Sequence, residues 1–251
     1  MAFIRWGVYS GCCDSGFTPS PVRRDLATGG RLSAGRSRFG ERMEPDFRLY
    51  LATDSKYLAG RDAVALIAGC IERGVTAVQL RAKEANSREL FELGRRLLAV
   101  TRPENVPLII NDRVDIMLSL GADGVHVGRD DLPVESVRAL APKAIIGSTA
   151  KSVEDVREAE IAGADYVGVG PVFATETKDK AGPVLGPEGV ASIAAASRLP
   201  CVGIGGINET NVTQLADCGL AGVCVIAGIL DQDDPPEAAA LLRWLMEAVE
   251  I

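Results

Sequence analysis

The chain repeats one short phrase three times, as Gly121-Ala122-Asp123-Gly124-Val125, Gly163-Ala164-Asp165-Tyr166-Val167 and Gly219-Leu220-Ala221-Gly222-Val223. In each copy a Gly that can adopt the left-handed conformation of a helix end stands just before an aliphatic run. A helix end followed at once by a strand is typical of a parallel βα unit. The phrase therefore predicts an internal βα repeat.

Outward from these phrases, eight short aliphatic runs alternate with amphipathic segments. The expected strands are Arg48–Ala52, Ala77–Arg81, Leu108–Asn111, Gly124–Val127, Ala144–Gly147, Tyr166–Val169, Cys201–Ile204 and Gly222–Ile226. The helical stretches between them include Ala63–Arg73, Arg88–Thr101, Val134–Leu140, Val153–Ala162 and Pro187–Ala196. Eight units in about 200 residues predict a closed (β/α)8 TIM barrel of the α/β class. An open doubly wound sheet would usually use fewer strands and longer crossovers.

Composition favours one domain over two small ones. Aliphatic residues dominate and aromatic residues make up only 5% of the 251 residues, which suits a parallel sheet buried under helices. The net charge of −7 argues against a nucleic-acid surface, which needs a clustered basic face. No apolar stretch approaches the roughly 20 residues of a membrane-spanning helix. We expect a cytoplasmic protein without nucleic-acid or membrane partners.

Residues 1–42 differ from the barrel domain, which we place at residues 43–251. They hold seven Arg against three acidic residues, and they show neither helical nor strand periodicity. Such a segment cannot bury enough surface to offset its ordering entropy, so we expect a disordered leader. Natural translation from Met43 is the preferred explanation. An Arg-rich and Ser-rich transit peptide is the alternative, although Asp14 and Asp25 count against it.

The cysteines form no CxxC motif. The six residues are Cys12, Cys13, Cys70, Cys201, Cys218 and Cys224. The last four lie in apolar or helical settings, which favours buried free thiols in a reducing compartment over a disulfide framework or a zinc site.

Polar residues follow the expected strands at the end of a barrel where active sites lie. After the second strand, alternation turns Gln79, Arg81 and Lys83 to one side, and two extended cations with an amide suit a polyphosphate. A solvated charge cluster is the alternative. An unpartnered amide at Gln79, within the aliphatic strand, would however be costly.

Carboxylates end the next two strands, in Asn111-Asp112 and in Gly128-Arg129-Asp130-Asp131. Mg²⁺ usually takes one or two protein carboxylates and leaves its other positions to substrate and water. The pattern therefore predicts a Mg²⁺ site beside the cations. Without those cations, simple capping of the following helix by Asp130 or Asp131 would be the better explanation.

Two further segments predict a second anion site. The sixth strand is followed by a long loop, residues 170–178, in which Thr175, Thr177 and Lys178 could hold an anion or act as a mobile lid. The seventh and eighth strands end in Gly205-Gly206 and Ala227-Gly228, where barrels frequently bind a monophosphate through backbone amides. Two anion sites predict two phosphorylated small-molecule substrates.

These segments together resemble the thiamine phosphate synthase (thiamine-phosphate pyrophosphorylase) family from about Leu49 to Leu230. The resemblance rests on five motifs: Gln79-Leu80-Arg81-Ala82-Lys83, Asn111-Asp112, His126-Val127-Gly128-Arg129-Asp130-Asp131, residues 170–178, and Gly203-Ile204-Gly205-Gly206-Ile207. It implies a transferase of thiamine biosynthesis that condenses 4-amino-2-methyl-5-(diphosphooxymethyl)pyrimidine with 4-methyl-5-(2-phosphoethyl)thiazole or its carboxylated form. The products are thiamine phosphate and pyrophosphate.

The same resemblance implies roles for individual residues. The pyrimidine pyrophosphate would be bound by Gln79, Leu80, Arg81, Ala82, Lys83, Asn111, Thr149 and Lys178. The thiazole phosphate would be bound by Thr175, Glu176, Thr177, Gly206, Ile226 and Ala227. Asp112 and Asp131 would bind Mg²⁺. The residues expected to act in catalysis are Arg81, Lys83, Thr149 and Lys178.

The sequence departs from the family pattern after the fifth strand, where Gly147-Ser148-Thr149-Ala150-Lys151 replaces a usual Gly-x-Ser-x-His. Either Ser148 or Thr149 would contact the pyrimidine, and Lys151 replaces the His. Arg129 stands where Gln is more common, while Asp131 is retained. The only histidine, His126, lies within a strand and reads as a hydrogen-bonded structural residue rather than a general base.

The mechanism implied by the resemblance is dissociative, with a methylene cation formed as pyrophosphate leaves. Two rivals share the scaffold: a thiazole tautomerase relative, which needs no pyrophosphate site, and a catalytically silent phosphate-binding barrel. The cations after the second strand and the Asp112 and Asp131 pair argue against the tautomerase, whereas Lys151 is the best hint of the silent barrel. The sequence leaves the oligomeric state open, with a homodimer as one arrangement.

Overall fold

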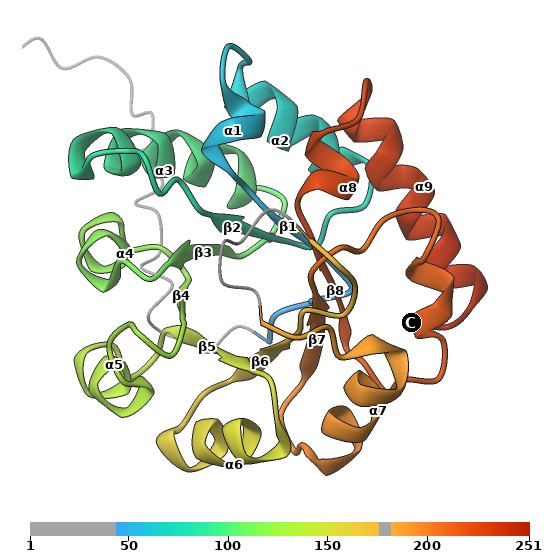
Figure 1. Cartoon of the computed structure of the whole chain (residues 1–251). Helices are drawn as coiled ribbons and strands as arrows, with labels where there is room; N and C mark the ends of the chain where they lie inside the picture. The colour runs from blue at the N-terminus through green and yellow to red at the C-terminus, as the bar shows by residue number, and fades with distance from the viewer. Residues whose placement is uncertain (1–43, 176–181) are drawn as a thin grey trace, which may run out of the picture. The chain divides into compact units, whose positions relative to one another are not determined.

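The computed structural model describes residues 44–175 and 182–251. Eight parallel strands close into a barrel in the order β1 to β8 (Figure 1). The ring is completed by pairing of β8 with β1, in which Leu49 is in register with Val223. The strands are β1 (Leu49–Ala52), β2 (Ala77–Leu80), β3 (Leu108–Asn111), β4 (Gly124–Val127), β5 (Ile145–Ala150), β6 (Tyr166–Val169), β7 (Cys201–Ile204) and β8 (Gly222–Val225). The prediction of a TIM barrel is confirmed, while the leader at residues 1–42 lies outside the described residues.

Helices surround the barrel (Figure 1). They are α1 (Ser55–Leu58), α2 (Ala63–Glu72), α3 (Ser87–Thr101), α4 (Val114–Leu120), α5 (Val134–Leu140), α6 (Val153–Ala162), α7 (Gly186–Ala196), the 3-10 turn η2 (Val212–Leu215), α8 (Ala227–Leu230) and α9 (Pro235–Ala248). Within the described residues, no helix combines the length and the apolar character that crossing a membrane requires.

The repeated phrase has the geometry that its sequence predicts. Gly121 and Gly163 end α4 and α6 with positive φ angles of 59° and 88°, and each leads directly into a strand. Gly219 also has a positive φ, of 67°, but it follows η2 rather than an α-helix. Glycine adopts this conformation without the steric cost that a Cβ atom would add.

Two layers of apolar side chains hold the barrel together. The larger layer lies between the strands and the helices. The smaller one, which we name the inner barrel core, consists of Phe47, Tyr50, Ala52, Ala77, Ile109, Ile145, Tyr166, Val202 and Cys224. Because alternate strand residues point to opposite faces, every second residue of a strand enters this inner core. Buried side chains therefore fill the barrel and form the floor of any site above them.

One strand is longer than predicted. β5 extends to Ala150, whereas the sequence predicts its end at Gly147, so Ser148 and Thr149 belong to the strand. Small polar residues weaken the aliphatic signal of a strand, yet the pairing continues, with Ser148 opposite Val167 and Thr149 opposite Gly168 of β6. Strand alternation then fixes which of the two hydroxyls faces the barrel interior.

The four described cysteines, Cys70, Cys201, Cys218 and Cys224, are buried free thiols, as predicted. Burial raises the pKa of Cys70 and of Cys224 to about 12. Both sulfurs therefore remain protonated at neutral pH.

Candidate active site

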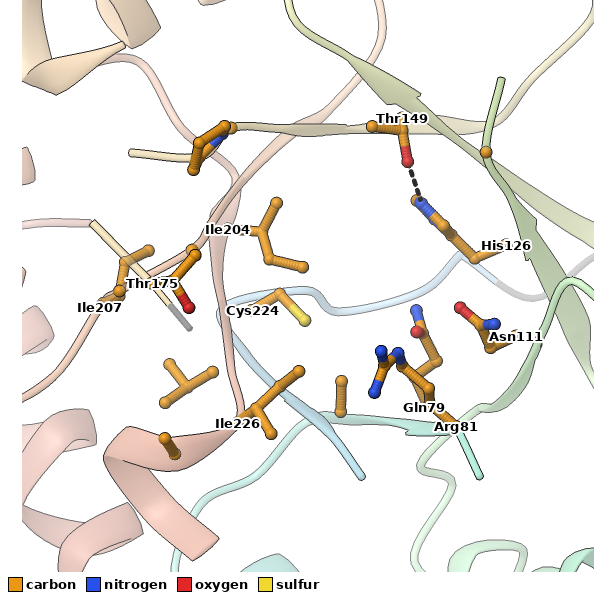
Figure 2. Close-up of a pocket in the computed structure, with 18 of the residues that line it drawn as sticks. Gln79, Arg81, Asn111, His126, Thr149, Thr175, Ile204, Ile207, Cys224 and Ile226 are labelled. Atoms are coloured by element: carbon orange, nitrogen blue, oxygen red, sulfur yellow. Dashed lines mark hydrogen bonds between the residues drawn. The ribbon is translucent and has the colours of Figure 1, made fainter. Parts of the chain in front are cut away.

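A cavity of about 610 Å³ opens at the carboxyl ends of the strands. Residues that follow each of the eight strands line it, so segments distant in sequence meet at one rim. Figure 2 shows that Gln79, Arg81 and Asn111 lie on one side of this cavity, while Thr175, Ile204 and Ile207 lie on the other. A volume of this size can hold a small organic substrate.

Most residues expected to bind substrate or metal meet in this cavity. Eleven of them line it: Gln79, Arg81, Lys83, Asn111, Asp112, Asp131, Thr149, Thr175, Gly206, Ile226 and Ala227. The remaining loop residues, Glu176, Thr177 and Lys178, lie outside the described residues. The described residues among them therefore meet in one cavity, as the sequence predicts, while the two anion sites and the role of each residue stay predictions.

Two of the residues expected to bind the pyrimidine pyrophosphate, Leu80 and Ala82, do not turn their side chains into the cavity. Leu80 is fully buried in the layer between strands and helices, and Ala82 packs against that same layer. Neither lines the cavity, because alternation along β2 sends them to the opposite face from Gln79, Arg81 and Lys83. Their side chains are therefore structural.

Arg81 is held at the rim by the end of β1. The Thr53 hydroxyl accepts a hydrogen bond from the Arg81 amide and donates one to the Arg81 carbonyl, each at 2.9 Å. The Arg81 guanidinium forms an ion pair with Asp54, and both side chains are largely buried. Asp54 also caps α1 by accepting from the Lys56 amide. One carboxylate thus orients a cation over the cavity.

Asn111 and Asp112 form the end of β3. The Asn111 Nδ2 atom donates to the Asp112 Oδ2 atom at 2.5 Å, and the Asp112 amide donates to the His126 carbonyl at 2.8 Å. Asp112 has a positive φ of 50°, a conformation that few residues other than Gly, Asn and Asp adopt readily. This backbone turn accompanies the placement of the carboxylate in the cavity lining.

Two carboxylates come from neighbouring strands. Burial, and then the charge of Asp131, raise the pKa of Asp112, whereas Lys83, Arg113 and Arg81 act in the opposite direction. The Asp131 Oδ2 atom accepts from the Gly128 amide at 2.7 Å. Within the described residues, no group of three or more acidic, His or Cys side chains forms a closed metal cage.

An open pair of carboxylates fits Mg²⁺, which in phosphate chemistry takes one or two carboxylates and completes its shell with substrate oxygens and water. Burial and the charge of Asp131 raise the pKa of Asp112, so a cation bound beside the two carboxylates would favour the ionised form of Asp112. The donor set therefore fits a Mg²⁺ ion that arrives with a phosphorylated substrate.

The Gly-rich end of β7 lies on the opposite side. Gly205 and Gly206 have positive φ angles of 103° and 67°. A Cβ atom on Gly206 would come within 2.4 Å of the Ala174 carbonyl oxygen, so only Gly fits against the loop after β6. Ile226 and Ala227 bring the start of α8 to the same region of the cavity lining. The first amides of a helix have no acceptor within it, and they suit a phosphate.

The structure separates the two hydroxyls that the sequence leaves as alternatives. Thr149 lines the cavity, and its Oγ1 atom lies 3.1 Å from the Nε2 atom of His126 (Figure 2). Ser148 does not line this cavity and instead lines a groove beside α5 and α6. Thr149 is therefore the hydroxyl that a ligand in the cavity can reach.

A chain of hydrogen bonds runs under the cavity. The Gln79 Nε2 atom donates to the Tyr50 hydroxyl at 3.0 Å, and the hydroxyls of Tyr50 and Tyr166 are 3.0 Å apart. The Tyr166 hydroxyl is 3.0 Å from His126 Nδ1. The unpartnered amide that would have been costly at Gln79 thus has a buried partner, and the hydrogen-bonded state expected for His126 is confirmed.

Sequence reasoning missed the residues after β1. Lys56 and Tyr57 of α1 line the cavity, and Asp54 holds Arg81. The same signal used elsewhere, polar residues directly after an aliphatic strand, is present in Thr53-Asp54-Ser55-Lys56. The two tyrosines carry no such signal, because Tyr50 and Tyr166 read as ordinary apolar strand residues.

Two of the departures from the family pattern, Lys151 and Arg129, lie close together. Lys151 lines the cavity where the usual His would stand, and its backbone amide donates to Asp155 at 2.8 Å. The exposed Arg129 side chain forms an ion pair with the same Asp155, at 2.5 Å. The pairing directs the end of the Arg129 side chain toward α6, while Arg129 and Asp131 both still line the cavity.

Comparison with known proteins agrees with this geometry. A family profile described as thiamine monophosphate synthase matches residues 49–229. A thiamine-phosphate synthase of Caldanaerobacter subterraneus subsp. tengcongensis is 47% identical over 205 residues, which cover 81% of this chain and 95% of the relative. One of Haloarcula marismortui is 46% identical over 206 residues, covering 80% and 98%.

A solved structure, thiamine phosphate pyrophosphorylase from Pyrococcus furiosus, superposes with a TM-score of 0.75 at 36% identity. The match covers 82% of this chain and 98% of that one. Profile, sequence relatives and structure agree over the whole barrel. The chain therefore belongs to the thiamine monophosphate synthase family of transferases.

Proposed function

We propose that this protein is a thiamine-phosphate synthase that joins the pyrimidine diphosphate to the thiazole phosphate and releases pyrophosphate. The observation that carries the proposal is the meeting of Arg81, Lys83, Asp112 and Asp131 in one cavity whose opposite side is the Gly205-Gly206 turn. One side suits a diphosphate with a metal ion, and the other suits a monophosphate. A tautomerase would need only the second.

In the proposed reaction, the bond between the pyrimidine methylene carbon and the diphosphate oxygen breaks, and its electron pair leaves with the diphosphate. The 4-amino group of the ring stabilises the resulting methylene cation, and the thiazole nitrogen then donates its lone pair to that carbon. No proton is transferred in the bond-forming step, so no general base is required.

The chain contributes binding, charge and alignment. Arg81, kept in place by Asp54, and Lys83 would bind the diphosphate oxygens and stabilise the negative charge that develops as the bond breaks. The Gly205-Gly206 turn and the start of α8 would anchor the thiazole phosphate and so hold its nitrogen near the methylene carbon. Such alignment makes the reaction between the two bound substrates effectively intramolecular.

Asp112 and Asp131 would hold Mg²⁺, which would supply positive charge to the leaving diphosphate. Thr149 would contact the pyrimidine from the side of β5. The carboxylated thiazole phosphate is proposed as an alternative second substrate, whose carboxyl group would leave as carbon dioxide in addition to the release of pyrophosphate.

The direct test is incubation of purified protein with both phosphorylated substrates and Mg²⁺. We expect thiamine phosphate and pyrophosphate to form in equal amounts. Isomerisation of a thiazole without pyrophosphate release would support the tautomerase instead. Binding of phosphate without any turnover would support a silent barrel.

Variants connect the activity to the cavity. Lys83→Ala should lower kcat/KM by about a hundredfold, because a charge-assisted contact to the leaving group is lost. Lys143→Ala is a matched control, since Lys143 is an exposed lysine that precedes β5 at the opposite end of the barrel. Equal activity of the two folded variants would contradict the assignment.

A further inference from the structure

Five side chains from five strands form one continuous hydrogen-bonded chain across the barrel. It runs from Gln79 through Tyr50, Tyr166 and His126 to Thr149, with donor–acceptor distances of 3.0 or 3.1 Å at every step. Gln79, His126 and Thr149 line the cavity, whereas the two tyrosines belong to the inner barrel core beneath it. The ends of the chain are therefore open to a ligand and its middle is closed.

The fold makes space for the two tyrosines. The Tyr166 ring lies over Gly147 of β5, where a Cβ atom would come within 2.2 Å of the ring. Phe47 packs against the same ring with a centroid distance of 4.2 Å. Both tyrosines are at most 1% exposed, and burial raises the pKa of each, so both hydroxyls remain protonated.

Burial also fixes the direction of the chain. The Tyr50 hydroxyl accepts from Gln79 and must donate its own proton to a neighbour, because an unsatisfied buried hydroxyl is costly. The acceptor at 3.0 Å is the Tyr166 oxygen. In that direction Tyr166 would donate to His126 Nδ1, 3.0 Å away, and the ring proton would lie on Nε2, 3.1 Å from Thr149 Oγ1.

We propose that Tyr50 and Tyr166 are positioning residues that hold His126 in the tautomer protonated at Nε2. Through His126 they orient Thr149 as a hydrogen-bond donor toward the pyrimidine ring, and Tyr50 orients Gln79 directly as an acceptor. The inference rests on the proposed function, since the ring in the cavity is taken to be the aminopyrimidine.

The two ends of the chain have opposite hydrogen-bonding character. Thr149 accepts from His126, so its own proton is directed to the cavity. Gln79 uses its amide nitrogen on Tyr50, so its carbonyl oxygen Oε1 is available to a ligand. A 4-aminopyrimidine carries an amino donor and a ring-nitrogen acceptor and matches this polarity. A 4-oxopyrimidine, with a carbonyl acceptor in place of the amino donor, does not.

The tautomer can be measured directly because the chain has a single histidine. Tag-free protein labelled with ¹⁵N-histidine gives one imidazole spin system in long-range ¹H–¹⁵N correlation spectra at pH 7.5. We expect a protonated Nε2 and an unprotonated Nδ1 without any substrate present. A ring protonated at Nδ1, an averaged pair of nitrogens or a cationic ring would overturn the proposal.

Two variants separate the links of the chain. Tyr166→Phe removes the donor to Nδ1, so the imidazole signals should shift toward a mixture of tautomers. Tyr50→Phe keeps the Tyr166 contact to His126 and should keep the tautomer, while Gln79 loses its fixed orientation. Both should raise KM for the pyrimidine diphosphate about tenfold and leave KM for the thiazole phosphate unchanged.

Thr101→Val is the control for loss of a buried hydroxyl. Thr101 Oγ1, in α3, is buried without a hydrogen-bond partner in the described part of the chain, so the variant should change neither the tautomer nor KM. If Tyr166→Phe does not fold, the wild-type spectrum and Tyr50→Phe decide the question. An unchanged tautomer in folded Tyr166→Phe, or an unchanged pyrimidine KM in Tyr50→Phe, would refute the role. A wild-type protein with the expected tautomer but no synthase activity would instead reject the proposed function.

Discussion

Asp131, which follows β4, lies near Asp112, which follows the neighbouring strand β3. Burial of Asp112 and the negative charge of Asp131 together raise the pKa of the Asp112 carboxyl. An acid whose pKa is raised by folding favours the folded state only while protonated. Its contribution is present at low pH and is lost as the pH rises through the folded pKa. Ionised Asp112 therefore costs the metal-free protein stability at neutral pH.

Asp112→Asn should consequently stabilise the metal-free protein at pH 7.5 while abolishing synthesis. Asn tolerates the positive φ of 50°, so the backbone turn is kept. We expect Tm to rise on the order of 1–2 °C, with the gain disappearing as the pH falls and wild-type Asp112 becomes protonated. Thermal unfolding from pH 4 to pH 8 in EDTA checks this, and Glu104→Gln, an exposed acid between α3 and β3, is the control. A variant less stable than wild type at pH 7.5 would argue against the electrostatic assignment.

Mg²⁺ should reverse the order of stability, so that the wild-type protein becomes more stable than Asp112→Asn. The ion supplies the positive charge that the carboxylate pair lacks, so in Mg²⁺ and pyrophosphate the Tm of wild type should rise and that of Asp112→Asn should not. Removal of the metal with EDTA should abolish turnover, and added Mg²⁺ should restore it. Full activity in excess EDTA would exclude the proposed metal site.

Asp54→Asn should lower kcat/KM for the pyrimidine diphosphate by about tenfold, because Arg81 loses its charged partner. Asn is also a good helix cap, so α1 should retain its start. Steady-state kinetics with each substrate varied in turn measures the effect. Asp62→Asn, at the cap of α2, is a matched control, since Asp62 pairs with an exposed arginine outside the cavity lining. The idea that Asp54 orients Arg81 fails if both variants behave alike.

Gly206→Ala should raise KM for the thiazole phosphate by at least about tenfold. The new Cβ atom would overlap the Ala174 carbonyl and displace the turn. Gly60→Ala is the matched control, because Gly60 has a similar φ of 73° but no atom within 4 Å of its would-be Cβ. Both variants carry the left-handed strain of roughly 1–2 kcal/mol, so only a steric effect separates them. Similar KM values for the two would show that the turn does not bind the phosphate.

Cys70 and Cys224 should resist alkylation in the native protein at pH 8, because burial raises the pKa of both thiols to about 12 and the thiolate is the reactive form. Both should react fully in denaturant at the same pH. Peptide mass spectrometry after iodoacetamide treatment measures each site separately. Rapid native labelling of Cys224, which also lines the cavity, would mean that its thiol is reactive from the cavity side despite its burial.

The strand order and the converging site could be predicted because they depend on periodicity. Aliphatic runs mark strands such as Tyr166–Val169, and polar residues directly after such runs mark the rim. The end of β5 was misplaced because Ser148 and Thr149 lack an aliphatic signal, although they pair with β6. Their different faces follow from alternation only once the strand is known to continue.

The tyrosines could not be assigned in the same way, whereas Asp54 carries the same signal, a polar residue directly after an aliphatic strand. The role of Tyr166 depends on a partner from another strand, Tyr50, that is 116 residues away in sequence, and no local pattern encodes that contact. Leu80 and Ala82 show the opposite problem. A motif such as residues 79–83 is assigned as one continuous segment, so it also includes residues whose side chains face the helices and not the cavity.

The inner barrel core closes the base of the cavity, so in the described part of the chain a ligand reaches the cavity from the carboxyl ends of the strands. Reactants and products would then share that route, and a substrate bound next to the base would have to enter before the other one. Gln79 and Thr149, which would bind the pyrimidine ring, lie next to the base of the cavity. The pyrimidine diphosphate would therefore be the first substrate to bind. The two substrates would therefore bind in a fixed order, whatever the rate of the chemical step.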